Sequence, residues 1–293
     1  MQAAQSLAAM AGTITLGGDL TVNRMGYGAM RITGEGIWGP PRDRAECIRV
    51  LKRCLDLGIN FIDTADSYGP HISEELIAEA LHPYPDGLVI ATKGGFERSG
   101  PNRWQMNGKP SHLEQALKGS LKRLKLDRID LYQLHRFDPK VPADETLGFL
   151  KEQQQQGYIR HLGLSEVNME QIQTAQRYFE VVSVQNLYNF ANQKWNDVLI
   201  YCEENNIAFI PWYPLASGNL EAEQAIKAVV ERHSKGGSTA TDFQIALAWL
   251  LAASRVMLPI PGTSSVKHLE ENTAATEISL TPEDLADMPL PAK

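Results

Sequence analysis

Short apolar runs that are rich in β-branched residues recur along the chain, and a stretch with helical periodicity follows each run. This alternation is typical of consecutive strand–helix units, which place their strands in a parallel sheet. Eight runs are present, and they begin near Met25, Ile59, Leu88, Ile129, Arg160, Val181, Ile207 and Val256.

The segments between the runs carry signals for helix starts and stops. Gly58 and Gly157 stand where two helices should stop, because glycine accepts the left-handed conformation that follows many helix ends. Three pairs of residues have the spacing of a capping box: Asp43 with Glu46, Ser111 with Glu114, and Thr241 with Gln244. One helical face carries a row of leucines: Leu113, Leu117, Leu121 and Leu124.

Eight such units in series are what a closed α/β barrel, the (β/α)8 or TIM barrel, requires. No linker rich in Pro, Gly or Ser divides the chain, so we expect one barrel domain over residues 1–293, with residues 1–12 as a frayed leader. The main alternative is a doubly wound dinucleotide fold, which would need three spaced glycines after its first strand. Gly26 and Gly28 begin that pattern, but Arg31 stands at the third glycine position, which favours the barrel.

Composition and charge narrow the class of partner. Among 293 residues there are 28 Lys and Arg against 35 Asp and Glu, and the net charge of −7 offers no basic surface for nucleic acid or anionic lipid. We therefore expect a small-molecule partner, with no nucleic acid and no membrane. The oligomeric state stays open, a monomer included.

The cysteines and the most apolar helix indicate the compartment. Cys47, Cys54 and Cys202 are an odd number without C-x-x-C spacing, so they predict neither a disulfide framework nor a zinc site, and we expect no metal. The apolar helical stretch at residues 243–254 is shorter than the roughly 20 residues of a membrane span. No basic residue precedes Arg24, so the charged start of a signal peptide is missing. These features predict a cytoplasmic protein with reduced cysteines.

Polar residues stand at the ends of three successive predicted strands, where a barrel builds its active site. The second strand gives FIDTADSYG, with Asp63 at its end and Tyr68 five residues later. The third gives IATKGG with Lys93, and the fourth gives LYQLHRFD with His135. An ammonium after an apolar strand must find an acid or stay solvated, and Asp63 is a partner on the adjacent strand.

This set of side chains suits the reduction of a carbonyl. A tyrosine has an ordinary pKa of about 10, so it donates a proton poorly near neutrality unless a cation stabilises its phenolate. Lys93 can be that cation for Tyr68, and Asp63 would keep the lysine charged. His135 could orient the carbonyl by hydrogen bonding.

With these residues in this order, the sequence resembles the aldo-keto reductase superfamily over about residues 19–280. Members of that family are (β/α)8 barrels that reduce carbonyls with a nicotinamide cofactor. Their catalytic tetrad matches Asp63, Tyr68, Lys93 and His135 in order and in strand-end context. The resemblance therefore implies an NAD(P)H-dependent oxidoreductase that converts aldehydes or ketones to alcohols.

Two downstream motifs match the segments that hold the nicotinamide in this family. GYIRHLGLS resembles the fifth-strand segment, where Ser165 and its successor would hold the carboxamide together with Gln185, although the family usually has asparagine in place of Glu166. PWYPLASG resembles the loop after the seventh strand, where Trp212 would stack on the ring. The residues near the phosphates would then be Leu215, Ser217 and Gly218.

A third motif, IPGTSSVKHLEEN, resembles the segment that binds adenosine in this family, where Glu271 and Asn272 match the usual adenine contacts. The family commonly places a lysine at Gly262 and an arginine at His268, both on the 2′-phosphate of NADP. Donors for a phosphate remain at the start of the following helix, and they are Thr263, Ser264, Ser265 and Lys267. We expect NADP(H) to be preferred over NAD(H).

Loop sequences suggest a substrate class. GIWGPPRD, YGPH and IPGTSSV look most like bacterial pyridoxal reductases within the superfamily. Aromatic residues in or near the loops at the barrel mouth would favour aromatic aldehydes, pyridoxal among them, although Trp104 could instead pack only its own loop. The predicted pocket residues are Trp38, Phe96, Trp104 and Phe137.

Two other functions remain open at this stage. A barrel that binds the cofactor could serve as a regulatory or redox-sensing subunit, as some members of this superfamily do. Barrels host many chemistries, so Lys93 could also form a Schiff base in a lyase.

Overall fold

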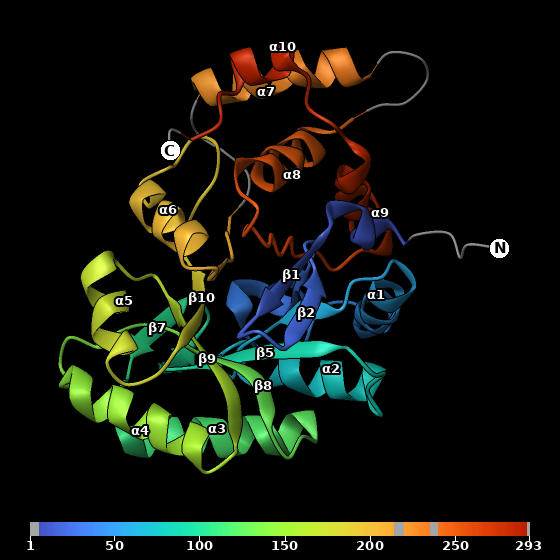
Figure 1. The fold of residues 1–293 in the computed structure, drawn as a ribbon. Helices are drawn as coiled ribbons and strands as arrows, with labels where there is room; N and C mark the ends of the chain where they lie inside the picture. The colour runs from blue at the N-terminus through green and yellow to red at the C-terminus, as the bar shows by residue number, and fades with distance from the viewer. Residues whose placement is uncertain (1–5, 214–219, 235–239, 292–293) are drawn as a thin grey trace.

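The apolar runs fold into parallel strands that curl into a barrel, as the computed structural model shows (Figure 1). The structure describes residues 6–213, 220–234 and 240–291. Within these ranges one parallel sheet has seven strands in the order β11-β10-β9-β8-β5-β4-β3. In chain order they are β3 (Tyr27–Gly28), β4 (Phe61–Asp63), β5 (Val89–Gly94), β8 (Ile129–Leu134), β9 (Ile159–Ser165), β10 (Val181–Gln185) and β11 (Ala208–Phe209).

An eighth segment, residues 256–261, closes the barrel between β11 and β3. On one side Leu258 N donates to Phe209 O at 2.8 Å, and on the other Gly26 N donates to Pro259 O at 2.9 Å. The segment is not a regular strand, because Pro259 and Pro261 have no N–H to donate to a ladder. The predicted (β/α)8 barrel is confirmed, with an irregular eighth strand at the predicted position.

Helices lie outside the strands, and α7 and α10 pack together at one end of the molecule (Figure 1). Three of the helices each carry an apolar side chain that is almost fully buried between helix and sheet, and these are Leu51, Ile77 and Leu117. Removal of apolar surface from water drives this packing. The helices of the described residues are α1 (Arg44–Asp56), α2 (Ile72–Leu81), α3 (Pro110–Leu124), α4 (Ala143–Gln155), α5 (Met169–Gln176), α6 (Asn196–Glu204), α7 (Leu220–His233), α8 (Asp242–Ala253), α9 (Val266–Ala274) and α10 (Pro282–Asp287).

Two of the three predicted helix starts are present. The side chain of Asp43 accepts a hydrogen bond from the backbone three residues later, and Thr241 forms a complete capping box. The prediction at Ser111 is wrong, because α3 begins one residue earlier at Pro110. Proline suits that first position, since its φ is already helical and no intrahelical donor is lost there.

The predicted helix stops are confirmed. Gly58 follows α1 with a φ of 80°, and Gly157 follows α4 with a φ of 84°. Both angles lie in the left-handed region, where a side chain would be strained.

Near the amino terminus the chain forms the 3₁₀ helix η1 (Leu7–Ala11), so the prediction of a frayed leader is wrong for these residues. Ala8 is fully buried, and its N–H donates to Leu57 O at 3.0 Å. Thr276, in the 3₁₀ helix η4 (Ala275–Glu277), donates its hydroxyl to Leu7 O at 2.8 Å. An antiparallel hairpin follows, formed by β1 (Thr13–Leu16) and β2 (Leu20–Asn23), which the sequence pattern did not predict.

The apolar stretch at residues 243–254 forms most of α8 and is buried in the core, where Trp249 Nε1 donates to Met288 O at 3.2 Å. No helix in the described ranges combines the length and the apolarity that a membrane crossing requires. Cys47, Cys54 and Cys202 are free and buried, and burial raises the pKa of each thiol, as expected for structural cysteines.

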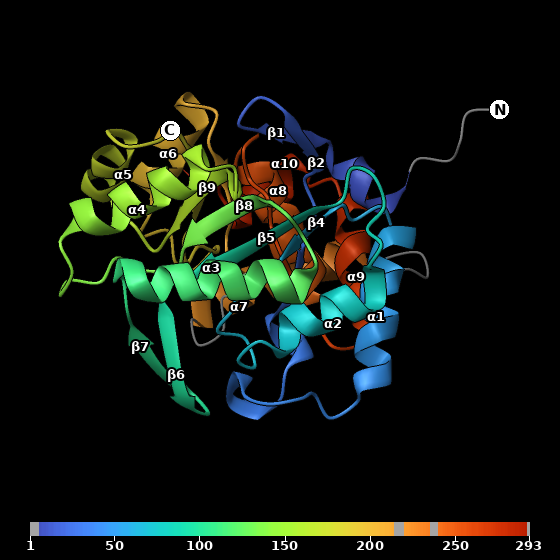
Figure 2. The same ribbon diagram turned by 90° about the horizontal axis from the view of Figure 1, so that it is seen from below.

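Two insertions at the carboxyl ends of strands shape the barrel mouth. After β3 the chain forms the 3₁₀ helices η2 (Ala29–Ile32) and η3 (Glu35–Ile37). After β5 it forms an antiparallel hairpin of β6 (Phe96–Gly100) and β7 (Arg103–Met106), which projects beyond α3 in Figure 2. These insertions bring aromatic side chains over the strand ends.

Candidate active site

Lys93 and Asp63 form a buried ion pair between neighbouring strands. Lys93 is fully buried, and its Nζ lies 2.5 Å from Oδ1 of Asp63. The same ammonium donates to Thr64 O at 2.9 Å and lies 3.5 Å from the hydroxyl of Tyr68. Burial alone would lower the pKa of Lys93, but Asp63 and Tyr68 together raise it above its ordinary value. Lys93 is therefore a permanent cation with every proton directed at an oxygen.

The other carboxylate oxygen of Asp63 is held by two amides. Gln133 Nε2 donates to Oδ2 at 2.9 Å, and Gln185 Nε2 donates to it at 3.0 Å. Our sequence reasoning missed Gln133, although it stands two residues before His135 on β8, where alternation places both side chains on the same side of the strand. A polar side chain two residues before His135 was the signal by which the sequence could have indicated Gln133. Together the three donors fix the Asp63 carboxylate.

Tyr68 is 7% exposed and opens onto the cavity described below. Burial raises the pKa of its phenol above the ordinary value, while the nearby Lys93 ammonium lowers it by a smaller amount. The expectation that Lys93 brings this pKa down is therefore correct in sign but outweighed by burial. Tyr68 is a protonated phenol at neutral pH, whose conjugate phenolate would face a cation.

His135 follows β8 and lies beside Tyr68, with 5.9 Å between the two ring centroids. Its Nδ1 lies 3.5 Å from Oγ of Ser67. Burial lowers the pKa of His135 well below its usual range, and the cations Lys93 and Arg136 lower it further. The imidazole is therefore neutral near pH 7 and can donate one N–H to a carbonyl oxygen.

Asp63, Tyr68 and His135 open onto one cavity of about 640 Å³. Phe96 and Trp104, brought in by the β6–β7 hairpin, line it, and their rings lie 4.7 Å and 6.4 Å from the His135 ring. Trp38 and Phe137 are not among the described residues that line this cavity, so the structure does not bring them to the pocket as predicted. Trp38 packs instead near the guanidinium of Arg98, 5.7 Å from its Cζ, and Phe137 packs against the core.

Arg98 ties the hairpin to the neighbouring loops. Its Cζ lies 3.6 Å from the ring centroid of Trp104, and it donates to Ser67 O, next to Tyr68, at 2.8 Å. Further hydrogen bonds run to four more carbonyls, those of Gly36, Ile37, Gly100 and Arg103. No sequence pattern indicated this contact set, because it joins three loops that are distant in the chain.

Three of the predicted nicotinamide contacts line the same cavity, namely Ser165, Gln185 and Trp212. Glu166, in the left-handed region with a φ of 54°, accepts hydrogen bonds at Oε1 from Trp212 Nε1 at 2.8 Å and from Leu187 N at 2.5 Å. The carboxylate at this unusual position therefore fixes the indole of Trp212.

The predicted adenosine segment lies at a second cavity of about 600 Å³, which is lined by Arg31, Gly262, Thr263 and Ser264 among others. Gly262 and Arg31 also line the first cavity, so the two adjoin. On α9, His268 is exposed, Glu271 is half-buried and Asn272 is buried. The predicted phosphate contacts Leu215, Ser217 and Gly218 lie outside the described residues.

Comparison with known proteins identifies this arrangement. The model of the aldo/keto reductase family matches residues 24–289. The chain belongs to the aldo/keto reductase family. It is 54% identical to an uncharacterised oxidoreductase of Schizosaccharomyces pombe over 96% of this chain and 90% of that protein. It is 42% identical to pyridoxine 4-dehydrogenase of Escherichia coli over 94% of this chain and 96% of that protein.

Solved structures agree with the family and the fold. An aldo-keto reductase from Klebsiella pneumoniae in complex with NADPH superposes with a TM-score of 0.78 at 26% identity, covering 96% of both chains. The chain is thus an oxidoreductase with a (β/α)8 barrel that reduces carbonyl compounds with a nicotinamide cofactor.

The residues of this aldo/keto reductase fit such a cofactor. A flat indole at Trp212 faces the same cavity as the hydroxyl of Ser165 and the amide of Gln185, which suits an aromatic ring with a carboxamide. A Cβ at Gly28 would lie 2.6 Å from Ile260 O, so only glycine lets β3 and the eighth strand approach this closely beneath the cavity. Gln185 uses Nε2 for Asp63, which leaves its Oε1 to accept from an amide.

Proposed function

We propose that this aldo/keto reductase prefers NADPH and reduces aromatic aldehydes, with Tyr68 as the proton donor. The observation that carries the proposal is the buried line of groups from Asp63 through Lys93 to Tyr68, with contacts of 2.5 Å and 3.5 Å, at the base of an aromatic cavity. The whole chain would act as one barrel domain.

Ser165, Gln185 and Trp212 would hold the nicotinamide, which when bound would supply the hydride for the carbonyl carbon. The Tyr68 hydroxyl gives its proton to the carbonyl oxygen, and the phenolate that results is stabilised by Lys93. Neutral His135 donates a hydrogen bond to the same carbonyl oxygen and so orients the substrate. Asp63 keeps Lys93 charged and fixed in position.

Pyridoxal is the aldehyde that we propose to test first. The E. coli relative is named pyridoxine 4-dehydrogenase, and the wall formed by Phe96 and Trp104 suits a flat ring. The aromatic wall would favour this class over sugar phosphates.

The proposed preference for NADPH rests on cations and hydroxyls near α9. Arg31 lines both cavities, is exposed, and has no ion-pair partner among the described residues, so its guanidinium is available for a phosphate. Lys267, by contrast, lies 3.7 Å from a carboxylate oxygen of Glu271. Glu46 accepts a hydrogen bond from the N–H of Val266, so this donor at the first turn of α9 is already used. Arg31 therefore adds a cation to the hydroxyls of the predicted segment.

The state of Lys93 argues against a Schiff-base lyase. A lysine must be neutral to attack a carbonyl. Here Asp63 and Tyr68 raise its pKa, and its donors are all directed at oxygens. Cytoplasmic location and a small carbonyl compound as the partner stay predictions from the sequence.

The test is a screen for oxidation of NADPH at 340 nm, a wavelength at which only the reduced cofactor absorbs, with pyridoxal, benzaldehyde and glyceraldehyde phosphate, and with NADH in parallel. We expect the two aromatic aldehydes to be reduced with higher kcat/KM than the sugar phosphate, and NADPH to bind at least about tenfold more tightly than NADH. Better turnover of the sugar phosphate, or equal affinity for the two cofactors, would refute the corresponding part of the proposal.

A further inference from the structure

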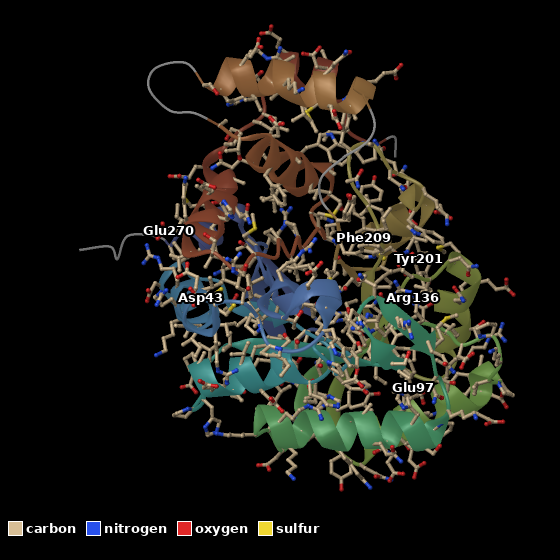
Figure 3. The ribbon with its side chains drawn as sticks, turned by 180° about the vertical axis from the view of Figure 1, so that it is seen from behind. Asp43, Glu97, Arg136, Tyr201, Phe209 and Glu270 are labelled. Carbon is tan, nitrogen blue, oxygen red and sulfur yellow. The ribbon has the colours of Figure 1, made fainter. Side chains whose placement is uncertain are left out.

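Arg136 places a second cation at the aromatic end of the active-site cavity. It follows His135 directly after β8, is half-buried, and lines the cavity together with Phe96 and Trp104. Figure 3 labels Arg136. Its Cζ lies 5.6 Å from the ring centroid of Phe96. The guanidinium is therefore within reach of a molecule that occupies the aromatic wall.

The hydrogen bonds of Arg136 use one side of its guanidinium. Nη1 donates to His135 O at 2.6 Å and to Ser165 Oγ at 3.0 Å. Nε and Nη2 donate to no acceptor in the described part of the chain. These two nitrogens share the edge of the fork that binds a carboxylate with two parallel hydrogen bonds. The open edge is thus the one suited to an anionic oxygen.

Arg98 contacts the same aromatic side chains, but its hydrogen bonds are those of a structural arginine. All three of its nitrogens donate to backbone carbonyls, with Nη1 bonded to Ile37 O and Ser67 O. All the guanidinium nitrogens of Arg98 are therefore used in hydrogen bonds that stabilise the fold. Arg136 has the opposite pattern, since it is anchored at one nitrogen and open at the others.

Arg136 forms no ion pair with a nearby carboxylate of the described residues, although the charge of Glu166 partly offsets the effect of burial on its pKa. Asp63 is paired with Lys93, and Oε1 of Glu166 is held by two N–H groups, one of them from Trp212. No carboxylate of the described residues lies within 4.0 Å of the Arg136 guanidinium, the distance that defines an ion pair. A partly desolvated cation with a free edge is most stable when a ligand supplies the missing negative charge.

We propose that Arg136 binds an anionic oxygen, a carboxylate or a phenolate, carried on the ring of the aromatic aldehyde. The ring would lie against Phe96 and Trp104, with its carbonyl at Tyr68 and its anionic group on the open edge of Arg136. This inference rests on the proposed function and narrows its substrate class. It makes Arg136 a specificity-determining residue that touches substrate and does not itself give up a proton in the reaction.

Matched substrates test the charge requirement. The 3- and 4-carboxybenzaldehydes are compared with their methyl esters, which keep the ring and the aldehyde but lose the negative charge. We expect the wild-type protein to show at least about tenfold higher kcat/KM for one of the acids than for its ester, the gain of one charge-assisted contact. Arg136→Gln should lower kcat/KM for the acid to the level measured for its ester in the same variant, so that the preference is abolished, and Arg136→Lys should keep part of it.

An equilibrium measurement separates substrate binding from catalysis. Calorimetry with benzoate on the protein–NADP complex should show binding by the wild type and at least about tenfold weaker binding by Arg136→Gln. Arg103→Gln removes the same charge from an exposed position on the neighbouring hairpin, and it should leave benzoate binding and the acid preference intact.

The outcomes distinguish this inference from the proposed function. If both esters and acids are reduced equally well, the role of Arg136 is wrong while the proposed function stands. If Arg136→Gln weakens NADPH binding and keeps the acid preference, Arg136 serves the cofactor and the inference is overturned. If no aldehyde is reduced, the proposed function fails, and benzoate binding still decides whether Arg136 holds an anion.

Discussion

The ammonium of Lys93 lies 3.5 Å from the phenolic oxygen of Tyr68. Both groups are buried, so the interaction between the cation and a phenolate is only weakly screened by water. Burial makes the phenol a weaker acid, and Lys93 is the one group of the described residues that stabilises the conjugate base through both a hydrogen bond and its charge. We propose that the chemistry of the site depends on this contact.

Lys93→Met should lower kcat for aldehyde reduction by about 100-fold or more, because without the cation the pKa of Tyr68 rises further. The affinity for NADPH, measured by quenching of tryptophan fluorescence, should change little. Lys118→Met is the control, since that lysine is exposed and paired with Glu114 on α3. Wild-type kcat in the Lys93 variant would show that the contact with Tyr68 has no catalytic role.

The neutral state of His135 predicts the pH profile. Burial, with Lys93 and Arg136 nearby, holds the pKa of this imidazole well below its usual range. The profile of kcat/KM for a neutral aldehyde should therefore show no inflection near pH 6.5, the ordinary value for histidine. An inflection at that pH that disappears in His135→Asn would contradict a neutral histidine in the free enzyme.

Arg98→Ala should loosen the aromatic wall, because five carbonyl contacts and the contact with Trp104 are lost together. We expect KM for benzaldehyde to rise about tenfold, the loss of roughly 1.4 kcal/mol of binding. Trp38→Ala should have a smaller effect on KM, since the ring packs near Arg98 and does not line the cavity. Arg103→Ala on the same hairpin is the control, and equal effects of the Arg98 and Arg103 variants would refute this role.

Asp66, on the loop between Asp63 and Tyr68, predicts a pH dependence of stability. Burial and the nearby Glu74 raise its pKa to about 8, and its Oδ1 has no hydrogen-bond partner among the described residues. The folded protein thus binds a proton that the unfolded chain releases near pH 4, so this group stabilises the fold less as pH rises from about 4 to 8.

Asp66→Asn mimics the neutral acid and removes that loss. Its gain in unfolding free energy over the wild type should grow between pH 5 and pH 8, with a ceiling of about 1.4 kcal/mol per pH unit. Urea unfolding of both proteins at the two pH values measures it. A difference that is constant with pH would mean that Asp66 is ionised in the folded protein.

Short sequence patterns predicted those parts of the fold and of the site that depend on single residues or on the ends of strands. Strand-end positions brought Asp63 and Lys93 together, because parallel neighbours in a barrel end at the same face. The stop at Gly58 was readable because one residue's conformational freedom decides it. The prediction at Ser111 failed because the adjacent Pro110 is a stronger start signal.

Contacts between distant loops could not be read from the sequence. Arg98 reaches the carbonyls of Ile37 and Ser67, which lie 61 and 31 residues away, and no periodicity encodes such contacts. The same contacts decide that Phe96 and Trp104 line the cavity while Trp38 does not. The open edge of Arg136 depends on what surrounds it in space and likewise has no sequence signature.

The most direct test of the account is the activity of Tyr68→Phe. This variant removes only the hydroxyl that lies 3.5 Å from Lys93, so we predict a fall in kcat for benzaldehyde reduction of at least about 100-fold, with the dissociation constant for NADPH unchanged within about twofold. Retention of more than about a tenth of the wild-type kcat would contradict the role of Tyr68 as the proton donor.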